Sequence, residues 1–406
     1  MHKMKNKKTI IYLHRYPIEE EAFLCPATRS ILDLLTKKYN VIYISLKSKK
    51  IDKELRKGLI IRELPFTIDR KDPKDKWIKT ILWYFCLPKI KKIILKSKPS
   101  FIVHKEQMPF IPSFLSRLNI KLLQDIGDWW WTTLLCKYNL EKISEKIENI
   151  EIRDWNKSKN LILTAHSKAE ASMIAKRGMD PNRIFVINHP SSKETFRPVD
   201  ASEIKKKLNL TKDNWIIAVH GITHPSKDYN LLLNWWSKIS KEHKNWILLN
   251  IGGTTGEKWY RKRLKQLKIE DNAIITGWIS NPEKLNKYLN AADCLLVTRK
   301  NNLANQGLIP SSLWHSMSIG KPLIITGLPG LSEHIQDRKS GYSYIPDNYE
   351  SFRSTLEHIY NNPQEAKKVA KNGIKRGEKV FNTKRCTKKY FNLIDDLISE
   401  KEIVKP

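Results

Sequence analysis

Short apolar runs alternate with longer amphipathic segments along the whole chain, and this alternation limits the possible fold more than any other feature of the sequence. Parallel strands need a crossover connection, which a helix usually supplies, so the pattern predicts βαβ units. In the first half we expect strands at 10–14, 41–46, 59–64, 101–104, 121–125, 161–165 and 184–188. We expect helices there at 27–38, 77–98, 111–117, 140–157 and 168–176, with a break at Pro88.

A second series of the same kind follows residues 190–207, which are rich in serine, proline and charge and indicate a linker. Its expected strands are 215–220, 246–252, 273–276, 293–298, 322–326 and 341–345. Its expected helices are 229–240, 259–267, 282–290, 311–319, 331–337, 349–361, 363–379 and 383–400. Two successive doubly wound α/β domains would place a ligand in the cleft between them, where the carboxyl ends of both sheets can face each other.

The five cysteines are scattered without a short paired spacing, which argues against a disulfide framework and a zinc site and suits a reducing cytoplasm. No apolar stretch approaches the roughly 20 residues that span a bilayer. The apolar run behind the basic N-terminus is too short for an export signal. We therefore expect a cytoplasmic protein.

The net charge of +32 would attract polyanions such as anionic lipids, nucleic acid or phosphorylated substrates. A general lysine bias of the source genome is the alternative. Residues 77–98 interleave tryptophan, phenylalanine and isoleucine with lysine, as an interfacial membrane helix does, although a surface helix packed on its own domain has the same pattern. Nucleic-acid binding is not expected, because the charge is diffuse and no known nucleic-acid motif occurs.

Two glycine loops follow predicted strands of the second half. Gly221 would let the backbone approach a ligand, and Lys227 could carry positive charge to an anion. Gly252 and Gly253 follow the next strand. Ordinary turns with a solvated lysine are the alternative at both places.

A third loop opens the predicted helix 311–319, with Pro310 at the expected first helical position. Free backbone N–H groups and the helix dipole would make this turn an anion site, for which a diphosphate is the natural occupant. The expected contacts are Gly307, Leu308, Ile309, Pro310 and Ser311. His315 could reach past the phosphates, or it could be a packed or solvated histidine.

Several motifs occur in the order known from one enzyme family. Residues 186–198 follow the frame of "VIPNGVDxxxFxP" without its Asn-Gly. Gly221 and Lys227 match "GR…KG", with Ile222 at the arginine position. Residues 277–278 and 291–293 match "GW…AAD", residues 318–324 match "AxGKPVI", and Gly330 with Glu333 matches "GGxxE". On these motifs the chain resembles the family 4 glycosyltransferases, retaining enzymes of GT-B fold, over nearly its whole length.

The resemblance implies two Rossmann-like doubly wound parallel-sheet domains facing across a cleft. It implies an acceptor-binding domain at 1–200, a nucleotide-sugar-binding domain at 201–380, and a C-terminal helix at 381–406 that crosses back to the first domain. It implies a nucleotide-diphosphate sugar as donor substrate, no cofactor and no metal. The implied donor contacts are Gly221, Lys227, Gly252, Gly253, Trp278, Ile279, Gly307, Leu308, Ile309, Pro310, Ser311, His315 and Glu333.

The chain also departs from the family pattern. The family carries two glutamates eight positions apart, the second on the donor ribose, where this chain has Gly307 and His315. Gly127 stands where many members have a histidine that touches the donor sugar, and Asp128 is the nearest group that could replace it. We expect Asp128, Lys227 and His315 to carry catalysis.

The expected acceptor is a glycan, a lipid-linked sugar or a protein at the cytoplasmic membrane face. Trp129, Trp130 and Trp131 could form a platform on which acceptor sugar rings stack, although core packing is an equal alternative. A weakened GT-B protein that binds a nucleotide sugar or a partner without turnover remains open, and a GT-B epimerase is a further option.

Overall fold

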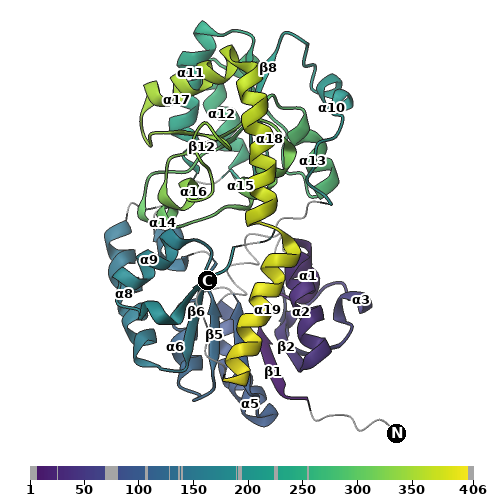
Figure 1. Cartoon of the computed structure of the whole chain (residues 1–406), viewed down its shortest axis with the longest axis vertical. Helices are drawn as coiled ribbons and strands as arrows, with labels where there is room; N and C mark the ends of the chain where they lie inside the picture. The colour runs from purple at the N-terminus through teal and green to yellow at the C-terminus, as the bar shows by residue number, and fades with distance from the viewer. Residues whose placement is uncertain are drawn as a thin grey trace.

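The computed structural model describes residues 7–24, 26–68, 81–105, 108–127, 129–135, 138, 140–188, 190, 194–223, 227–253 and 256–400. Figure 1 shows two α/β lobes stacked along the long axis of the molecule. The described part of the first lobe holds a seven-stranded sheet and that of the second a six-stranded sheet. The two Rossmann-like sheets confirm the predicted α/β fold class.

The first sheet has the order β3-β2-β1-β4-β5-β6-β7, and its neighbouring strands pair in parallel. Its strands are β1 (Thr9–Leu13), β2 (Asn40–Lys47), β3 (Leu59–Thr67), β4 (Phe101–Lys105), β5 (Leu122–Asp125), β6 (Leu161–Ala165) and β7 (Ile184–Val186). Among the helices between them are α1 (Ile18–Leu24), α2 (Pro26–Lys38), α3 (Lys53–Arg56), α5 (Leu87–Ser97), α6 (Ile111–Ser116), α7 (Trp130–Leu135), α8 (Glu141–Lys157) and α9 (Lys168–Lys176).

The second sheet has the order β10-β9-β8-β11-β12-β13 and is also parallel. Its strands are β8 (Trp215–His220), β9 (Trp246–Ile251), β10 (Ala273–Ile275), β11 (Cys294–Val297), β12 (Leu323–Thr326) and β13 (Tyr342–Tyr344). Its helices are α10 (Ser202–Lys207), α11 (Tyr229–Glu242), α12 (Glu257–Leu267), α13 (Pro282–Asn290), α14 (Leu303–Gln306), α15 (Ser311–Ile319), α16 (Pro329–Ser332), α17 (Tyr349–Asn361) and α18 (Pro363–Val380). In both sheets the order reverses beside the first strand, which is where doubly wound folds bind ligands.

The final helix, α19 (Thr383–Ser399), returns to the first lobe and lies beside α2 (Figure 1). Its buried Tyr390 and Ile394 belong to the same apolar cluster as Tyr12 of β1 and Val103 of β4. The Lys121 ammonium donates to the carbonyl of Leu397 at 3.2 Å. The last helix of the chain therefore completes one face of the first sheet's core.

The structure corrects several predicted elements. The helix expected at 331–337 is the shorter α16, which begins earlier because Pro329 fits a first helical turn. The expected linker 190–207 ends in α10, and the expected strand 341–345 shortens to β13. The break expected at Pro88 is present: helical residues end at 85, Cys86 is a turn, and Pro88 lies in the first turn of α5, where its missing N–H costs nothing.

Candidate functional site

The carboxyl ends of β8 and its two neighbours bring the predicted glycine loops together. Gly221 follows β8 with a φ of 106°, a conformation that favours glycine. Its N–H donates to the carbonyl of Ile251 at 3.0 Å, so the backbone of this loop runs against the end of β9. A Cβ built on Gly252 would lie 1.9 Å from the Gly221 carbonyl oxygen, a spacing that no side chain tolerates. The two loops therefore meet backbone to backbone at the sheet edge.

Lys227 folds back into this edge instead of extending into solvent. It is 6% exposed, and its ammonium donates to the carbonyl of His220. Burial lowers the pKa of Lys227 well below its usual range, and the positive charge of Arg299 lowers it further. Arg299 follows β11, the strand beside β8, so the sheet order brings a second cation to the same place. Such a site favours an anion.

Two histidines lie beside the lysine. His220 Nε2 and His315 Nδ1 are 3.5 Å apart, and His220 is 4% exposed. The other face of His315 stacks on Phe196, with ring centroids 3.8 Å apart. Burial lowers the pKa of His220 well below its usual range, with His315 and Lys227 adding to this, and burial lowers the pKa of His315 to about 3. Both imidazoles are therefore neutral when the site holds no ligand.

Two buried polar atoms here have no hydrogen-bond partner in the part of the chain that the structure describes. They are Nδ1 of His220 and Oγ1 of Thr223. A buried polar atom without a partner costs about 1–3 kcal/mol, so such atoms mark places where a ligand or water binds. The sequence analysis gave neither residue a role, although His220 immediately precedes Gly221.

The predicted anion turn before α15 lies at the junction of the two lobes. The Ser167 hydroxyl, from the first lobe, donates to the Gly307 carbonyl at 2.7 Å. A Cβ on Gly307 would lie 2.7 Å from the Cα of Glu170. Gly307 thus allows the backbones of the two lobes to come into contact. From the sequence, a close approach was predicted at this glycine, but to a ligand. Pro310 is the N-cap of α15 and not its first residue, and Ser311, which begins the helix, is exposed.

The remaining predicted donor contacts lie around the same edge. Trp278 is 50% exposed, while Leu308 and Ile279 are partly buried and Ile309 is buried. A Cβ on Gly253 would lie 3.2 Å from the Cα of Gly277, so the loop before Trp278 packs on the glycine pair. Glu333 reaches across to the first lobe, where its carboxylate accepts hydrogen bonds from the amides of Lys168 at 2.7 Å and Ala169 at 3.2 Å.

In the first lobe the three tryptophans do not form one exposed surface. Trp129 is 5% exposed, and its indole donates to Glu170 at 3.2 Å. Trp130 and Trp131 lie on α7 and are partly exposed, with ring centroids 5.1 Å apart. Asp128 lies outside the described residues, and Gly127 has open space around its Cα. Only Trp130 and Trp131 can offer ring area to a ligand.

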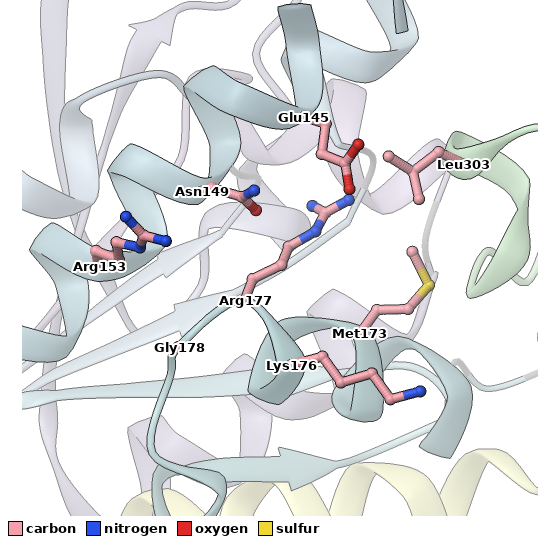
Figure 2. Close-up of a pocket in the computed structure, with 8 residues that line it drawn as sticks. All are labelled: Glu145, Asn149, Arg153, Met173, Lys176, Arg177, Gly178 and Leu303. Carbon is pink, nitrogen blue, oxygen red and sulfur yellow. The ribbon is translucent and has the colours of Figure 1, made fainter. Parts of the chain in front are cut away.

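A cavity of about 350 Å³ opens where α8 and α9 of the first lobe meet α14 of the second. Figure 2 shows Glu145 and Arg177 pointing toward each other across it, with Leu303 on the opposite wall. Arg177 is fixed by a 2.9 Å bond to Glu148 and lies over the Trp129 ring. The cavity lies beside the interdomain contact and is distinct from the cationic edge of the second sheet.

In the described residues one group of side chains has the spacing of metal ligands, namely Glu242, His243 and Glu357. Arg353 already pairs with both carboxylates, at 2.7 and 2.9 Å. His243 stacks on Trp246 at the start of β9, the opposite edge of the sheet from Gly252. This group is therefore a charged surface cluster away from the candidate site.

A family model matches the second lobe, and solved structures match the fold of nearly the whole chain. Residues 200–376 match the model of the family "Glycosyl transferases group 1". The D-inositol 3-phosphate glycosyltransferase of Segniliparus rotundus is 24% identical over 203 residues, which cover 48% of this chain and 44% of that protein. The putative glycosyltransferase YtcC of Bacillus subtilis is 24% identical over 206 residues, covering 48% and 49%. The matched part thus spans less than half the length of these curated relatives.

Solved structures match nearly the whole chain. Anabaena Alr3699/HepE in complex with UDP and glucose superposes with a TM-score of 0.71 at 12% identity, covering 96% of this chain and 100% of that chain. WaaG, a glycosyltransferase involved in lipopolysaccharide biosynthesis, superposes with a TM-score of 0.67 at 13% identity, covering 95% and 99%. At this identity the likeness is one of fold. The second lobe is therefore similar to the group 1 glycosyl transferases, and the whole chain shares the two-lobed GT-B fold of these solved structures.

Proposed function

We propose that the chain is a retaining glycosyltransferase that moves a sugar from a nucleotide-diphosphate donor to an acceptor held by the first lobe. The observation that carries the proposal is the buried cationic edge of the second sheet, where Lys227 and Arg299 lie together. Burying a lysine with a strongly lowered pKa is unfavourable for folding, but such a lysine binds an anion well. The diphosphate of a sugar nucleotide supplies the missing negative charge.

The same edge suits the chemistry of the transfer. As the glycosidic bond to the donor breaks, negative charge accumulates on the departing diphosphate. Lys227, Arg299 and the backbone N–H groups of Leu308, Ile309, Ser311 and Ser312 would stabilise that charge. Such groups are already in position before the reaction, and stabilisation of this kind is the largest single contribution in many enzymes. In this proposal no metal ion is needed for leaving-group stabilisation.

The first experiment compares the Lys227→Ala variant with the wild type in the turnover of a panel of nucleotide sugars. Because one preorganised charged contact contributes about 2.7–4 kcal/mol, we expect donor hydrolysis or transfer to fall by about 100-fold or more. Lys241→Ala, which changes an exposed lysine on α11 of the same lobe, is the matched control and should leave the rate unchanged. Turnover by Lys227→Ala at the wild-type rate contradicts the proposal. UDP-glucose belongs in the panel because Alr3699/HepE is known in complex with it.

We further propose that the acceptor is a glycan or lipid-linked sugar at an anionic membrane surface. Ile81 and Phe85 are 60% and 74% exposed. They precede α5, whose exposed lysines are Lys89, Lys91, Lys92 and Lys96. Trp83 and Ile90, which the sequence analysis counted with them, are buried in the core and do not face lipid. The described residues contain no helix that is both long and apolar enough to cross a bilayer, so contact would be interfacial.

A flotation assay tests the membrane proposal. The chain should float with vesicles that contain phosphatidylglycerol and not with vesicles of phosphatidylcholine alone. Phe85→Ser with Ile81→Ser should weaken flotation, while Ile345→Ser, at an exposed isoleucine of the second lobe, should not. Equal recovery with both vesicle types would remove the membrane from the proposal.

A second candidate is a GT-B protein that binds a nucleotide sugar without turnover. It is favoured by the position of His315, which stands at the family's second glutamate and is packed between Phe196 and His220. Binding without catalysis would raise the melting temperature with donor present, because a ligand that binds only the folded state stabilises it. No product would form with any donor in the panel.

A further inference from the structure

The histidine pair consists of the buried His220 and the partly buried His315, and it lies beside Lys227. Their facing nitrogens are 3.5 Å apart, so one ring donates an N–H and the other accepts it. That contact uses one nitrogen of each ring. The second nitrogen of His220, Nδ1, is buried and has no partner among the described residues. The pair therefore has unused hydrogen-bonding capacity inside the cationic edge.

The charges around the pair are positive. On β8 and its following loop lies Lys227, which bonds to the carbonyl of His220 itself, and after β11 lies Arg299. On the interdomain segment, Phe196 is uncharged and Arg197 lies toward Glu283, with 3.5 Å between them. Glu194 on the same segment is exposed to solvent.

Carboxylates on the neighbouring loops and helices have other partners. Glu257 accepts from Arg261 at 2.8 Å. Glu333 accepts from the amide of Lys168, and Glu170 accepts from the amide of His166 and the indole of Trp129. Asp228 interacts electrostatically with Lys300. Among the described residues, no carboxylate contributes to the pKa shifts of His220 and His315, so a ligand would have to supply the compensating charge.

We propose that His220 and His315 act as one proton-accepting unit, which takes up a proton from solvent when the donor diphosphate binds and then holds that diphosphate as a shared imidazolium. This inference rests on the proposed function. An anion within about 4–6 Å stabilises a protonated imidazole, whereas the empty site opposes it through burial and neighbouring cations. Proton and diphosphate therefore bind cooperatively, since each removes the cost of burying the other.

The sign of the pH effect follows from linkage. The bound state carries more protons than the free state at any pH between the free and bound pKa values of the pair. In that window the affinity for the diphosphate increases as the pH falls, by up to about tenfold per pH unit for one proton. Above the bound-state pKa the proton is no longer taken up, and the pH dependence disappears.

Isothermal titration of UDP-glucose into the full chain, in two buffers of different ionisation enthalpy, tests the proposal. The diester diphosphate of UDP-glucose does not titrate near neutral pH, so a buffer-dependent heat reports protons bound by the protein. We expect the wild type to take up about one proton more than His220→Gln or His315→Gln, each of which should also bind more weakly. His358→Gln, on α17, is the matched control and should retain the uptake.

The outcomes separate the two proposals. Binding of UDP-glucose without proton uptake by the wild type, across the neutral range, overturns the histidine proposal and leaves the donor site intact. Uptake in both histidine variants that equals the wild-type uptake also overturns it. Absence of binding for every nucleotide sugar in the panel contradicts the proposed function as well. Thermal unfolding of each variant confirms that a lost signal does not come from a lost fold.

Discussion

Gly252 is the residue at which the site tolerates least change. Its Cα lies so close to the loop after β8 that an added Cβ would be 1.9 Å from the Gly221 carbonyl oxygen. We predict that Gly252→Ala forces the two loops apart and displaces the Gly221 carbonyl, which directly follows the His220 carbonyl that accepts from Lys227. Overpacking of this kind costs about 1–3 kcal/mol. Urea unfolding should show that loss, and titration calorimetry should show weaker UDP-glucose binding.

The control for Gly252→Ala is the same substitution at a glycine with free space around it. Gly127→Ala adds the same methyl group in the first lobe, where nothing lies within 4 Å of the new atom. Its unfolding midpoint should equal that of the wild type. A Gly252→Ala protein with the unfolding midpoint of Gly127→Ala and the donor affinity of the wild type would show that the loops are not held in contact in solution.

Some residues of the candidate site could be predicted from the sequence, and others could not. Gly221, Gly252 and Lys227 could be predicted because glycine after a strand and a lysine in the following loop form a local pattern. Arg299 could not, because it follows β11, and only the order of the sheet places it near β8. His220 was missed because a histidine at the end of a buried strand has no distinctive spacing. Gly307 was predicted as a ligand contact, whereas its approach is to Glu170 of the other lobe.

Among the elements, α8 anchors two loops at the carboxyl edge of the first sheet through two buried carboxylates. Glu148 accepts from the amide and hydroxyl of Thr132 on α7, at 2.9 and 2.6 Å. Glu151, one turn later, accepts from the amide of Phe110 at 2.6 Å. Phe110 has a φ of 60°, which is strained for a residue with a side chain. The helix thus holds both loops of the proposed acceptor side by hydrogen bonds to their backbone.

Glu151 gives this anchor a pH dependence. Burial raises its pKa to about 7, although the Phe110 amide acts against this. The folded state therefore binds more protons than the unfolded state between the unfolded pKa, near 4.5, and about 7. The stabilising contribution is complete below the unfolded pKa and is lost as the pH rises through 7, by up to about 3 kcal/mol.

We predict that Glu151→Gln removes that loss, because glutamine keeps an acceptor oxygen for the Phe110 amide and cannot ionise. The difference in unfolding free energy between pH 5 and pH 8, measured in urea, should be smaller in Glu151→Gln than in the wild type. Glu145→Gln, at an exposed position of the same helix, should keep the wild-type difference. An unchanged difference in Glu151→Gln would mean that Glu151 is already ionised at pH 5.

The longer helices and strands could be predicted from the sequence, and the shortest helices could not. Strands such as β1 and β8, and helices such as α8 and α15, were placed within one residue at each end because their apolar periodicity extends over the element. The short helices α1, α3, α7 and α14 were not foreseen. They contain four to seven residues, too few for a helical period to appear, and tertiary contacts such as that of Glu148 with α7 hold them.

At the scale of the whole molecule, a small set of contacts holds the two lobes at the donor edge. Glu333 of the second lobe covers two amides at the N-terminus of α9 in the first, where the helix dipole favours a carboxylate. Ser167 caps the same helix through the amide of Glu170 at 2.9 Å and also donates to the Gly307 carbonyl. The chain crosses between the lobes again where α18 leads into α19. The contact between the lobes at the donor edge therefore depends on these side chains. The segments of chain that pass from one lobe to the other connect the lobes covalently.

We predict that Glu333→Ala loosens this closure without unfolding either lobe. The substitution leaves the Lys168 and Ala169 amides to water and removes a charge-assisted contact of about 1–2 kcal/mol. The radius of gyration from solution scattering should increase, and the turnover with saturating donor should fall more than the donor affinity, because both lobes are needed to align the substrates. Glu333→Gln, which keeps an acceptor oxygen, should lie between Ala and wild type, and Glu350→Ala, at an exposed glutamate of α17, should change neither quantity. Scattering curves that superpose for Glu333→Ala and wild type would show that the α9 contact does not govern the arrangement of the lobes.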